Sequence, residues 1–207
     1  MFRSPLFARS IFVAKKFFPI VVSLSTLGLV APSTALAQRH EESRAFAVVV
    51  RGPAVFNVIF GNDGRPTGPN PNFKGGCTSP VGLCIEAEIR SVHQDDVVGT
   101  MRVTIQEFPI AFGDSFTTKV VRAFEFRNGT VTTPVLNDFH GLTSEPPRFG
   151  GTKTFYLGYR DDGALSTGTG DFSHANFLTE MRGRMETVDT AIGAVPVYFD
   201  HLFLIRR

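Results

Sequence analysis

The sequence predicts an all-β protein: a single antiparallel β-barrel, or a β-sandwich, of about 8–10 strands. Three observations carry this prediction. Apolar and polar residues alternate through much of 151–188, as a sheet with one dry and one wet face requires. Asn128-Gly129 lies between two apolar runs and is the strongest short hairpin signal. No stretch keeps a helical period for more than a turn or two.

The N-terminal segment, residues 1–37, is predicted to be a cleaved signal peptide. A basic start precedes an apolar run at 17–30 that is too short to span a bilayer comfortably. Ala35-Leu36-Ala37 matches a small-x-small cleavage site before Gln38. A retained N-terminal anchor is the alternative. We therefore predict an exported protein, periplasmic or secreted, with no stable membrane span after cleavage and a single domain over 38–207.

The charge of this domain disfavours one class of partner. The full chain has 21 Lys and Arg against 19 Asp and Glu, but four of the basic residues and none of the acidic ones lie in 1–37. Residues 38–207 therefore carry 17 basic against 19 acidic residues, a net charge of −2. No nucleic-acid partner is predicted, because one would need a basic stripe on the folded domain. With 21 Phe and no Trp in the chain, the core is expected to be rich in Phe.

The domain is expected to begin with a strand at 46–50, which Gly52-Pro53 breaks or bulges before 55–60 continues it. Residues 62–76 are so dense in Gly, Pro and Asn that a long loop without ladder pairing is predicted. Cys77 and Cys84, the only cysteines, are predicted to form a disulfide that ties down the far end of this loop. A redox or metal-binding pair is the alternative, although the spacing is wider than CxxC.

Further strands are predicted at 85–90 and 101–105, where every second residue is apolar. The Asn128-Gly129 hairpin is expected to join a strand at 118–127 to one at 130–136. Two segments interrupt the alternation: 108–116 is predicted to be a connector, and 137–151 an irregular segment.

Three consecutive strands are then predicted at 152–160, 165–172 and 177–187, with Asp161-Asp162-Gly163 as the turn between the first two. The wet face of the third strand is expected to hold an ion-pair lattice of four residues: Glu180, Arg182, Arg184 and Glu186.

Two polar residues share a face with apolar neighbours and are predicted to project into the interior. Arg122 alternates with Val120 and Phe124, and His201 alternates with apolar residues in the last strand, 195–205, after a turn at 189–194. A buried polar residue in a barrel is either a satisfied core group or a contact for a ligand. For Arg122, a register break or an edge position is the alternative. Arg122, Phe124 and His201 are therefore candidate ligand-binding residues.

Asp171 and His174 are the other candidate ligand-binding residues. They follow a Gly-rich strand end, where the backbone could approach a ligand closely, and Asp171 could orient His174 as a general base or ligand. A capped turn with a solvated His is the alternative. Similar pairs occur elsewhere: Asp138 with His140, and His93 with Asp95 and Asp96. The three pairs could converge on a zinc ion, but no HxH or HExxH spacing in the sequence supports such a site. No metal and no cofactor are therefore predicted.

Residues 156–172, YLGYRDDGALSTGTGDF, combine a short aromatic strand, an Asp-Gly turn and a Gly-Thr-Gly stretch. In this pattern the chain resembles the small eight-stranded barrels of the allene oxide cyclase and dirigent group. The stretch that carries the resemblance is 17 residues long, and its motifs are generic. It implies a barrel and carries no catalytic residue over to this chain.

Three functions from different classes fit these residues. The first is an exported non-enzymatic binding protein that holds a small apolar or amphipathic ligand in a Phe-lined cavity, with Arg122 or His201 as the polar contact. The second is a barrel enzyme of cyclase or isomerase type, with His174, Asp171 and Arg122 as the acid/base candidates. The third is an extracytoplasmic protein-interaction or adhesion module. No GxSxG or other catalytic motif is found, which favours binding.

Overall fold

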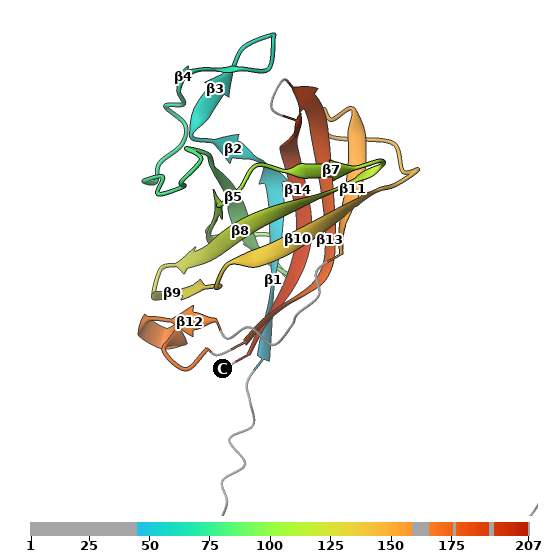
Figure 1. The fold of residues 1–207 in the computed structure, drawn as a ribbon. Helices are drawn as coiled ribbons and strands as arrows, with labels where there is room; N and C mark the ends of the chain where they lie inside the picture. Colours follow the sequence, from blue (N-terminus) through green and yellow to red (C-terminus); the bar gives the residue numbers. More distant parts are fainter. Residues whose placement is uncertain (1–44, 159–165, 176, 191–192, 207) are drawn as a thin grey trace, which may run out of the picture. The chain divides into compact units, whose positions relative to one another are not determined.

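The computed structural model describes residues 45–158, 166–175, 177–190 and 193–206. These residues form one antiparallel sheet of 12 strands and a second sheet of two, which confirms the predicted all-β class (Figure 1). Nowhere in the described part is there a helix long and apolar enough to cross a membrane. The elements in chain order are β1 (Ala45–Pro53), β2 (Val55–Phe56), β3 (Val58–Phe60), β4 (Pro66–Pro69), β5 (Cys84–Ser91), β6 (Val97–Ile105), β7 (Ile110–Phe112), β8 (Ser115–Phe126), β9 (Gly129–Thr132), β10 (Leu136–Leu142), β11 (Lys153–Gly158), β12 (Thr167–Gly168), the 3-10 turn η1 (Gly170–Phe172), β13 (Phe177–Thr190) and β14 (Gly193–Arg206).

Eight strands of the large sheet close into a ring. They follow the order β10-β11-β13-β14-β1-β5-β6-β8, and β8 pairs with β10 to complete the circuit. The first and last strands are neighbours, with registers from Ala45↔Arg206 to Pro53↔Tyr198. In Figure 1, β8 and β10 cross in front of β1 and β14, so two walls of the ring face each other. The ring is compatible with either predicted architecture, barrel or sandwich, and it pairs the long strands on both sides.

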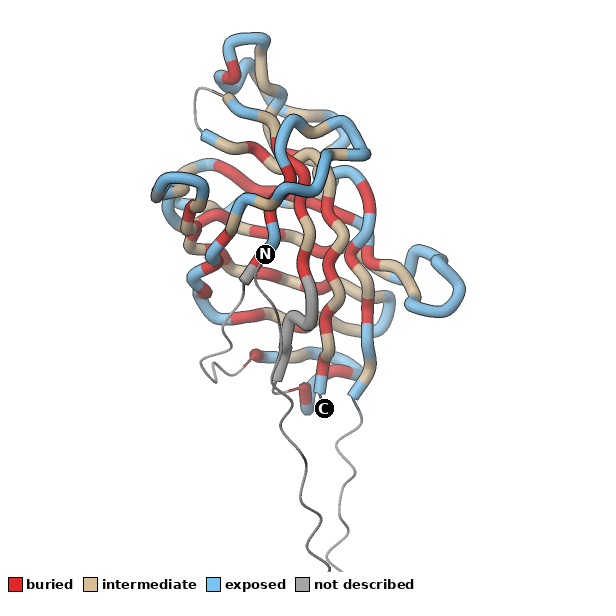
Figure 2. The backbone as a smooth tube through the Cα atoms, turned by 90° about the vertical axis from the view of Figure 1, so that its right-hand side faces the viewer, coloured by how far each residue is buried: buried red, intermediate tan, exposed pale blue. Residues whose placement is uncertain are grey.

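The core fills the inside of this ring. Along β8 and β14, buried residues alternate with half-buried ones, and Figure 2 shows the same alternation on the neighbouring strands. Phe124 and Phe203 are among the largest fully buried side chains, and their rings meet edge to face with centroids 4.9 Å apart. The core is therefore rich in Phe, as its composition predicts.

Three predicted loops contain strands. The connector at 108–116 holds β7 and the start of β8, and the irregular segment at 137–151 holds most of β10. The loop at 62–76 holds β4, which pairs with β3 in spite of Pro66 and Pro69. A prolyl nitrogen is tolerated there because each strand of a two-stranded sheet is an edge. The hairpin at Asn128-Gly129 is confirmed, although its second strand ends at Thr132.

The predicted three-strand unit is wrong in its middle. β11 pairs directly with β13, from Lys153↔Thr187 to Leu157↔Gly183. Of the strand predicted at 165–172, only β12 forms, and it pairs with β9. The turn at Asp161-Asp162-Gly163 lies outside the described residues.

The glycines near β12 allow two segments of the chain to approach each other closely. A Cβ atom on Gly129 would lie 2.2 Å from the carbonyl oxygen of Thr169, and one on Gly170 would lie 2.2 Å from that of Asn128. Both glycines also have positive φ, which a residue with a side chain adopts at a cost. The Gly-rich stretch is therefore explained by its contact with the Asn128-Gly129 turn.

Glu186 is buried, which overturns its predicted place on a wet face. Its side chain is only 1% exposed, and it lies beneath the segment that connects β10 to β11. It pairs with Arg184, as predicted, at 2.9 Å. Its carboxylate also accepts three backbone N–H groups, from Arg148 at 2.6 Å, Phe149 at 2.7 Å and Gly151 at 3.3 Å.

The misplacement does not come from the alternation. Met185 lies in the core, as predicted, and Glu186 on the other side of the strand is buried because residues 148–151 cover it. β13 also contains two register shifts, between Glu180 and Arg182 and between Glu186 and Thr187. The side chains of Glu180 and Arg182 lie outside the described part.

Replacing Glu186 by Gln is expected to lower the free energy of unfolding by about 2–3 kcal/mol at pH 7, because charge-assisted bonds to three backbone donors are lost. Burial raises the pKa of Glu186, but the three N–H donors and Arg184 lower it more, so the net pKa lies below the ordinary value of 4.5. A carboxylate with a depressed native pKa stabilises the fold above the unfolded-state pKa and loses that contribution as the pH falls through the native one.

Urea unfolding of wild type and Glu186→Gln should therefore show a difference that shrinks as the pH falls below about 4.5. Glu107→Gln is the matched control, because Glu107 is half exposed and pairs with the exposed Lys119. A difference that is independent of pH would contradict this role of the Glu186 carboxylate.

Cys77 and Cys84 form the predicted disulfide. Two further bonds fix the same segment: the Cys84 N–H donates to Asn57 Oδ1 at 2.9 Å, and Asn57 Nδ2 donates to the Gly82 carbonyl at 3.0 Å. Leu83 is consequently held between two anchored residues, where its side chain is buried.

Candidate functional site

A cavity lies inside the ring, between the faces of β5, β6, β8, β10, β13 and β14. Most of its wall is apolar, and the wall includes Phe56, Leu83, Met101, Phe116, Met185 and Phe199. Its volume is about 60 Å³, measured as the space open to the centre of a water-sized sphere. One water molecule needs only about 10–15 Å³ on that measure, so the cavity has room for a small molecule.

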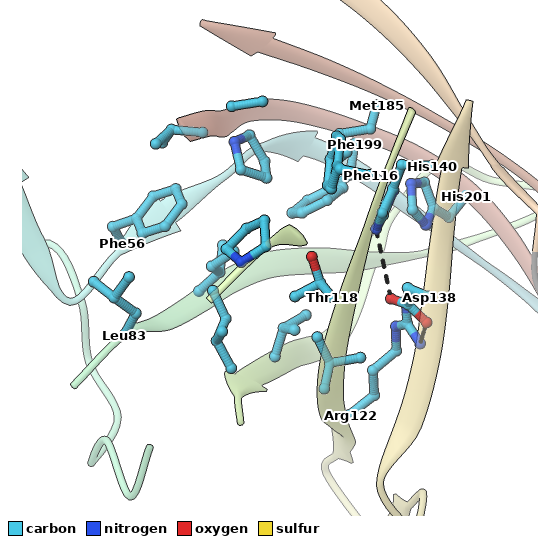
Figure 3. Close-up of a pocket in the computed structure, with 18 of the residues that line it drawn as sticks. Phe56, Leu83, Phe116, Thr118, Arg122, Asp138, His140, Met185, Phe199 and His201 are labelled. Carbon is cyan, nitrogen blue, oxygen red and sulfur yellow. Dashed lines mark hydrogen bonds and ion pairs between the residues drawn. The ribbon is translucent and has the colours of Figure 1, made fainter. Parts of the chain in front are cut away.

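Four polar side chains gather at one end of the cavity, and we call this group the polar end: Arg122, Asp138, His140 and His201. In Figure 3 they lie across the cavity from Phe56 and Leu83. Arg122 comes from β8, Asp138 and His140 come from β10, and His201 comes from β14. Strand alternation brings them together, because each is an inward position between outward neighbours.

Arg122 and Asp138 form a buried ion pair. Nη1 donates to Oδ1 at 3.1 Å and Nη2 donates to Oδ2, so the guanidinium meets the carboxylate through two parallel bonds. Arg122 is 4% exposed and Asp138 2%. The inward projection predicted for Arg122 is confirmed, and the alternatives of a register break or an edge position are wrong.

His140 stacks on Phe116, its cross-strand neighbour, with ring centroids 4.4 Å apart and an interplanar angle of 17°. Its Nε2 atom lies 4.0 Å from Asp138 Oδ2, which is beyond hydrogen-bond distance. Its Nδ1 atom is buried and has no hydrogen-bond partner among the described residues. His140 therefore presents a polar atom that nothing in the described protein satisfies.

Burial, together with the charge of Arg122 and the proximity of His201, holds the pKa of His140 well below its usual value of 6.5. The imidazole is therefore neutral at physiological pH, with one ring nitrogen as donor and the other as acceptor. Sequence reasoning named His140 only as part of a loop pair, because 137–151 was predicted to be irregular.

The free energy of unfolding is expected to fall as the pH drops below about 6.5, because the unfolded chain then binds a proton at His140 that the native state does not. His140 contributes at most about 1.4 kcal/mol per pH unit to the slope of the free energy of unfolding against pH. Urea unfolding between pH 7.5 and 5.5 should show a shallower slope in His140→Phe, which keeps the stack on Phe116. An unchanged slope would contradict the neutral, buried state of this side chain.

His201 projects inward, as predicted, and is 2% exposed. Its ring meets Phe199 edge to face at 5.1 Å and lies 5.9 Å from Phe203. Phe124, in contrast, is fully buried against Phe203 and does not line the cavity. The sequence thus predicted two residues of the polar end, Arg122 and His201, and one residue of the surrounding core.

Asp171 and His174 do not join the polar end. Both are exposed, at or just after η1, and neither lines the cavity. The Asp171 carboxylate accepts a hydrogen bond from Asn128 Nδ2, which fixes η1 on the β8–β9 turn. This geometry matches the alternative of a capped turn with a solvated His.

The three His/Asp pairs do not converge. Asp138 and His140 lie in the cavity, whereas His93, Asp95 and Asp96 are exposed in the turn between β5 and β6. Within the residues that the structure describes, no group of three or more His, Cys, Asp or Glu side chains is placed to hold a metal ion.

A second, wider hollow of about 260 Å³ adjoins the cavity at the rim of the ring. Pro109, Phe116 and Ala194 line both spaces, so the two hollows share a wall. Farther out, Lys153 and Asp189 form an ion pair at 2.8 Å across β11 and β13. We call this second space the rim hollow.

The fold and the site together define an all-β protein with a largely apolar cavity inside the ring and a buried polar end. No family model, curated protein or solved structure matches this chain.

Proposed function

We propose that this protein is an exported, non-enzymatic binding protein that holds a small apolar or amphipathic ligand in the cavity inside the ring. The observation that carries the proposal is the composition of the cavity wall: mostly apolar side chains surround a space that ends at the four residues of the polar end. Such a combination, a largely apolar pocket with a few convergent polar groups, is typical of small-molecule sites.

The energetics support binding. A ligand that fills the cavity transfers its apolar surface out of water, which contributes about 25 cal/mol per Å². The wall is a closed sheet whose strands pair on both sides, so little ordering entropy is lost when the ligand enters. The polar end then fixes the orientation of the ligand.

Entry is proposed from the rim hollow. Pro109, Phe116 and Ala194 form the wall between the two spaces; Pro109 directly precedes β7, and Ala194 lies at the start of β14. Side-chain rotation of Phe116 would join the hollow to the cavity without breaking a strand pairing. The predicted signal peptide supports export, and the Cys77–Cys84 disulfide is compatible with an oxidising compartment.

Native mass spectrometry of the full chain, expressed with export, tests the proposal. The expected spectrum shows a chain that begins at Gln38, is two hydrogens lighter through the disulfide, and carries a small molecule that collisional activation releases. A mass that retains residues 1–37 would overturn export with cleavage.

A matched pair of variants locates the ligand. Val103 faces the cavity, whereas Thr104 is on the opposite face of β6. Val103→Phe should fill the cavity and remove the adduct, and Thr104→Phe should leave it in place. Circular dichroism melting checks that both variants fold. An adduct that survives Val103→Phe, or a wild type that takes up no small apolar molecule, would overturn the proposal.

An acid/base enzyme of cyclase or isomerase type is the second candidate, favoured by the neutral imidazole of His140 inside the cavity. On this alternative His140 would exchange a proton with the ligand, in place of the sequence candidates Asp171 and His174, which lie elsewhere. A difference between the molecule added to the protein and the molecule released from it would favour this candidate.

A further inference from the structure

We infer that the cavity selects an uncharged ligand with one hydroxyl or carbonyl oxygen, which bonds to the imidazole of His140, and that it discriminates against carboxylates and amines. This inference rests on the proposed binding function and names its ligand class. It follows from the charges of the polar end and from the ring nitrogens of His140, of which Nδ1 has no partner among the described residues and Nε2 lies beyond bonding distance of Asp138.

The first step concerns charge. The guanidinium of Arg122 and the carboxylate of Asp138 face each other through two parallel bonds, and both groups are buried. Their charges therefore balance within the cavity wall. A ligand carboxylate or ammonium would therefore find no net counter-charge at the polar end. Either ion would lose its hydration without an ion to pair with, which costs several kcal/mol.

The second step concerns hydrogen bonding. The neutral imidazole of His140 has one donor and one acceptor nitrogen. Its Nδ1 is buried without a partner in the described residues, and its Nε2 is too far from Asp138 to bond. A hydroxyl oxygen both donates and accepts, so it can bond to a ring nitrogen of His140 in either tautomer. A carbonyl oxygen can do so when that nitrogen carries the proton.

The third step concerns shape. The polar end lies on one side of the cavity, and Phe56 and Leu83 lie on the other, with a remaining wall that is apolar except for Thr118 (Figure 3). A ligand with its oxygen at one end of an apolar body matches this arrangement. A second polar group on that body would face Phe, Leu and Met side chains and would be left unsatisfied.

A matched series of six-carbon molecules tests the inference: 1-hexanol, hexanoate and hexylamine, with toluene as a probe that has no hydrogen-bonding group. Affinities are measured by calorimetry at pH 8 on the exported, disulfide-bonded protein. At this pH hexanoate and hexylamine are charged and an imidazole of ordinary pKa is neutral. We expect 1-hexanol to bind at least about 100-fold more tightly than hexanoate or hexylamine.

The variant His140→Phe tests the role of the ring nitrogen. It should weaken binding of 1-hexanol by about 5- to 30-fold, because the hydroxyl loses its partner, and leave the affinity for toluene within about twofold. Hexanoate binding equal to that of 1-hexanol, or an affinity for 1-hexanol that His140→Phe does not change, would overturn the inference while the binding function stands. If none of the four probes binds, toluene included, the proposed function itself is overturned.

Discussion

Replacing Arg122 by Met is expected to lower the free energy of unfolding by about 3–5 kcal/mol, because it removes the guanidinium that balances the buried carboxylate of Asp138. Methionine keeps most of the aliphatic length of arginine, so loss of packing contributes little. The remaining carboxylate would be expelled toward water or would bind a proton, and the loss should therefore be smaller at low pH. Urea unfolding monitored by circular dichroism measures the effect.

The double variant Arg122→Met/Asp138→Leu should recover most of this loss, since a buried ion pair replaced by apolar residues of similar volume is often close to neutral. Arg65→Met is the matched control. Arg65 is exposed and lies 3.9 Å from the exposed Asp63, so its replacement should change stability by less than about 0.5 kcal/mol. A double variant as unstable as the single one would show that the guanidinium acts through contacts other than Asp138.

Replacing Phe124 by Ala is expected to destabilise the protein by about 3–5 kcal/mol, because a fully buried ring packed on Phe203 would leave a void. Phe139→Ala is the matched control on β10, where the Phe139 side chain is 46% exposed and little apolar area would be lost. Chemical unfolding of both variants measures the difference directly.

The same pair of variants also decides the role of Phe124 in binding. Since Phe124 does not line the cavity, the affinity for a cavity probe such as toluene should be retained in the folded fraction of Phe124→Ala. Normal stability with lost binding would instead make Phe124 a ligand contact, as the sequence suggested.

The fold class could be predicted because strand alternation survives over long stretches. From 116 to 124 in β8 and from 199 to 205 in β14 every second residue is buried, and Arg122 and His201 keep their place in that alternation although they are polar. The Asn128-Gly129 turn is local, so its hairpin could be assigned from two residues. These features depend on near neighbours in the sequence.

The remaining half of the polar end could not be predicted, because β10 inverts the usual pattern. Asp138 and His140 point inward and are buried, whereas Phe139 between them points outward and is exposed. A hydrophobic pattern assigns these faces the wrong way round. The buried ion pair of Asp138 with Arg122 explains the inversion. The pattern of β10 does not reveal this pair, because Arg122 lies on another strand.

Asp171 and His174 became candidates because they are close in sequence and follow glycines. Those glycines instead belong to the region where η1 contacts the turn at Asn128-Gly129. Contacts between distant segments decide which glycines face a ligand and which face another part of the chain, and a single sequence does not contain them.

The position of β14 has a consequence for how the protein folds. It lies between β13 and β1, so the ring cannot close until a strand near residue 206 has paired with one that begins at residue 45. A chain still emerging from a ribosome or from a membrane channel lacks this link, and its partly formed sheet keeps two unpaired edges. Folding is therefore expected to finish only after the last strand is released, at the slow rate that such distant pairings impose. During that interval the open edges of β13 and β1 are where a chaperone, or a second unfinished chain, would bind.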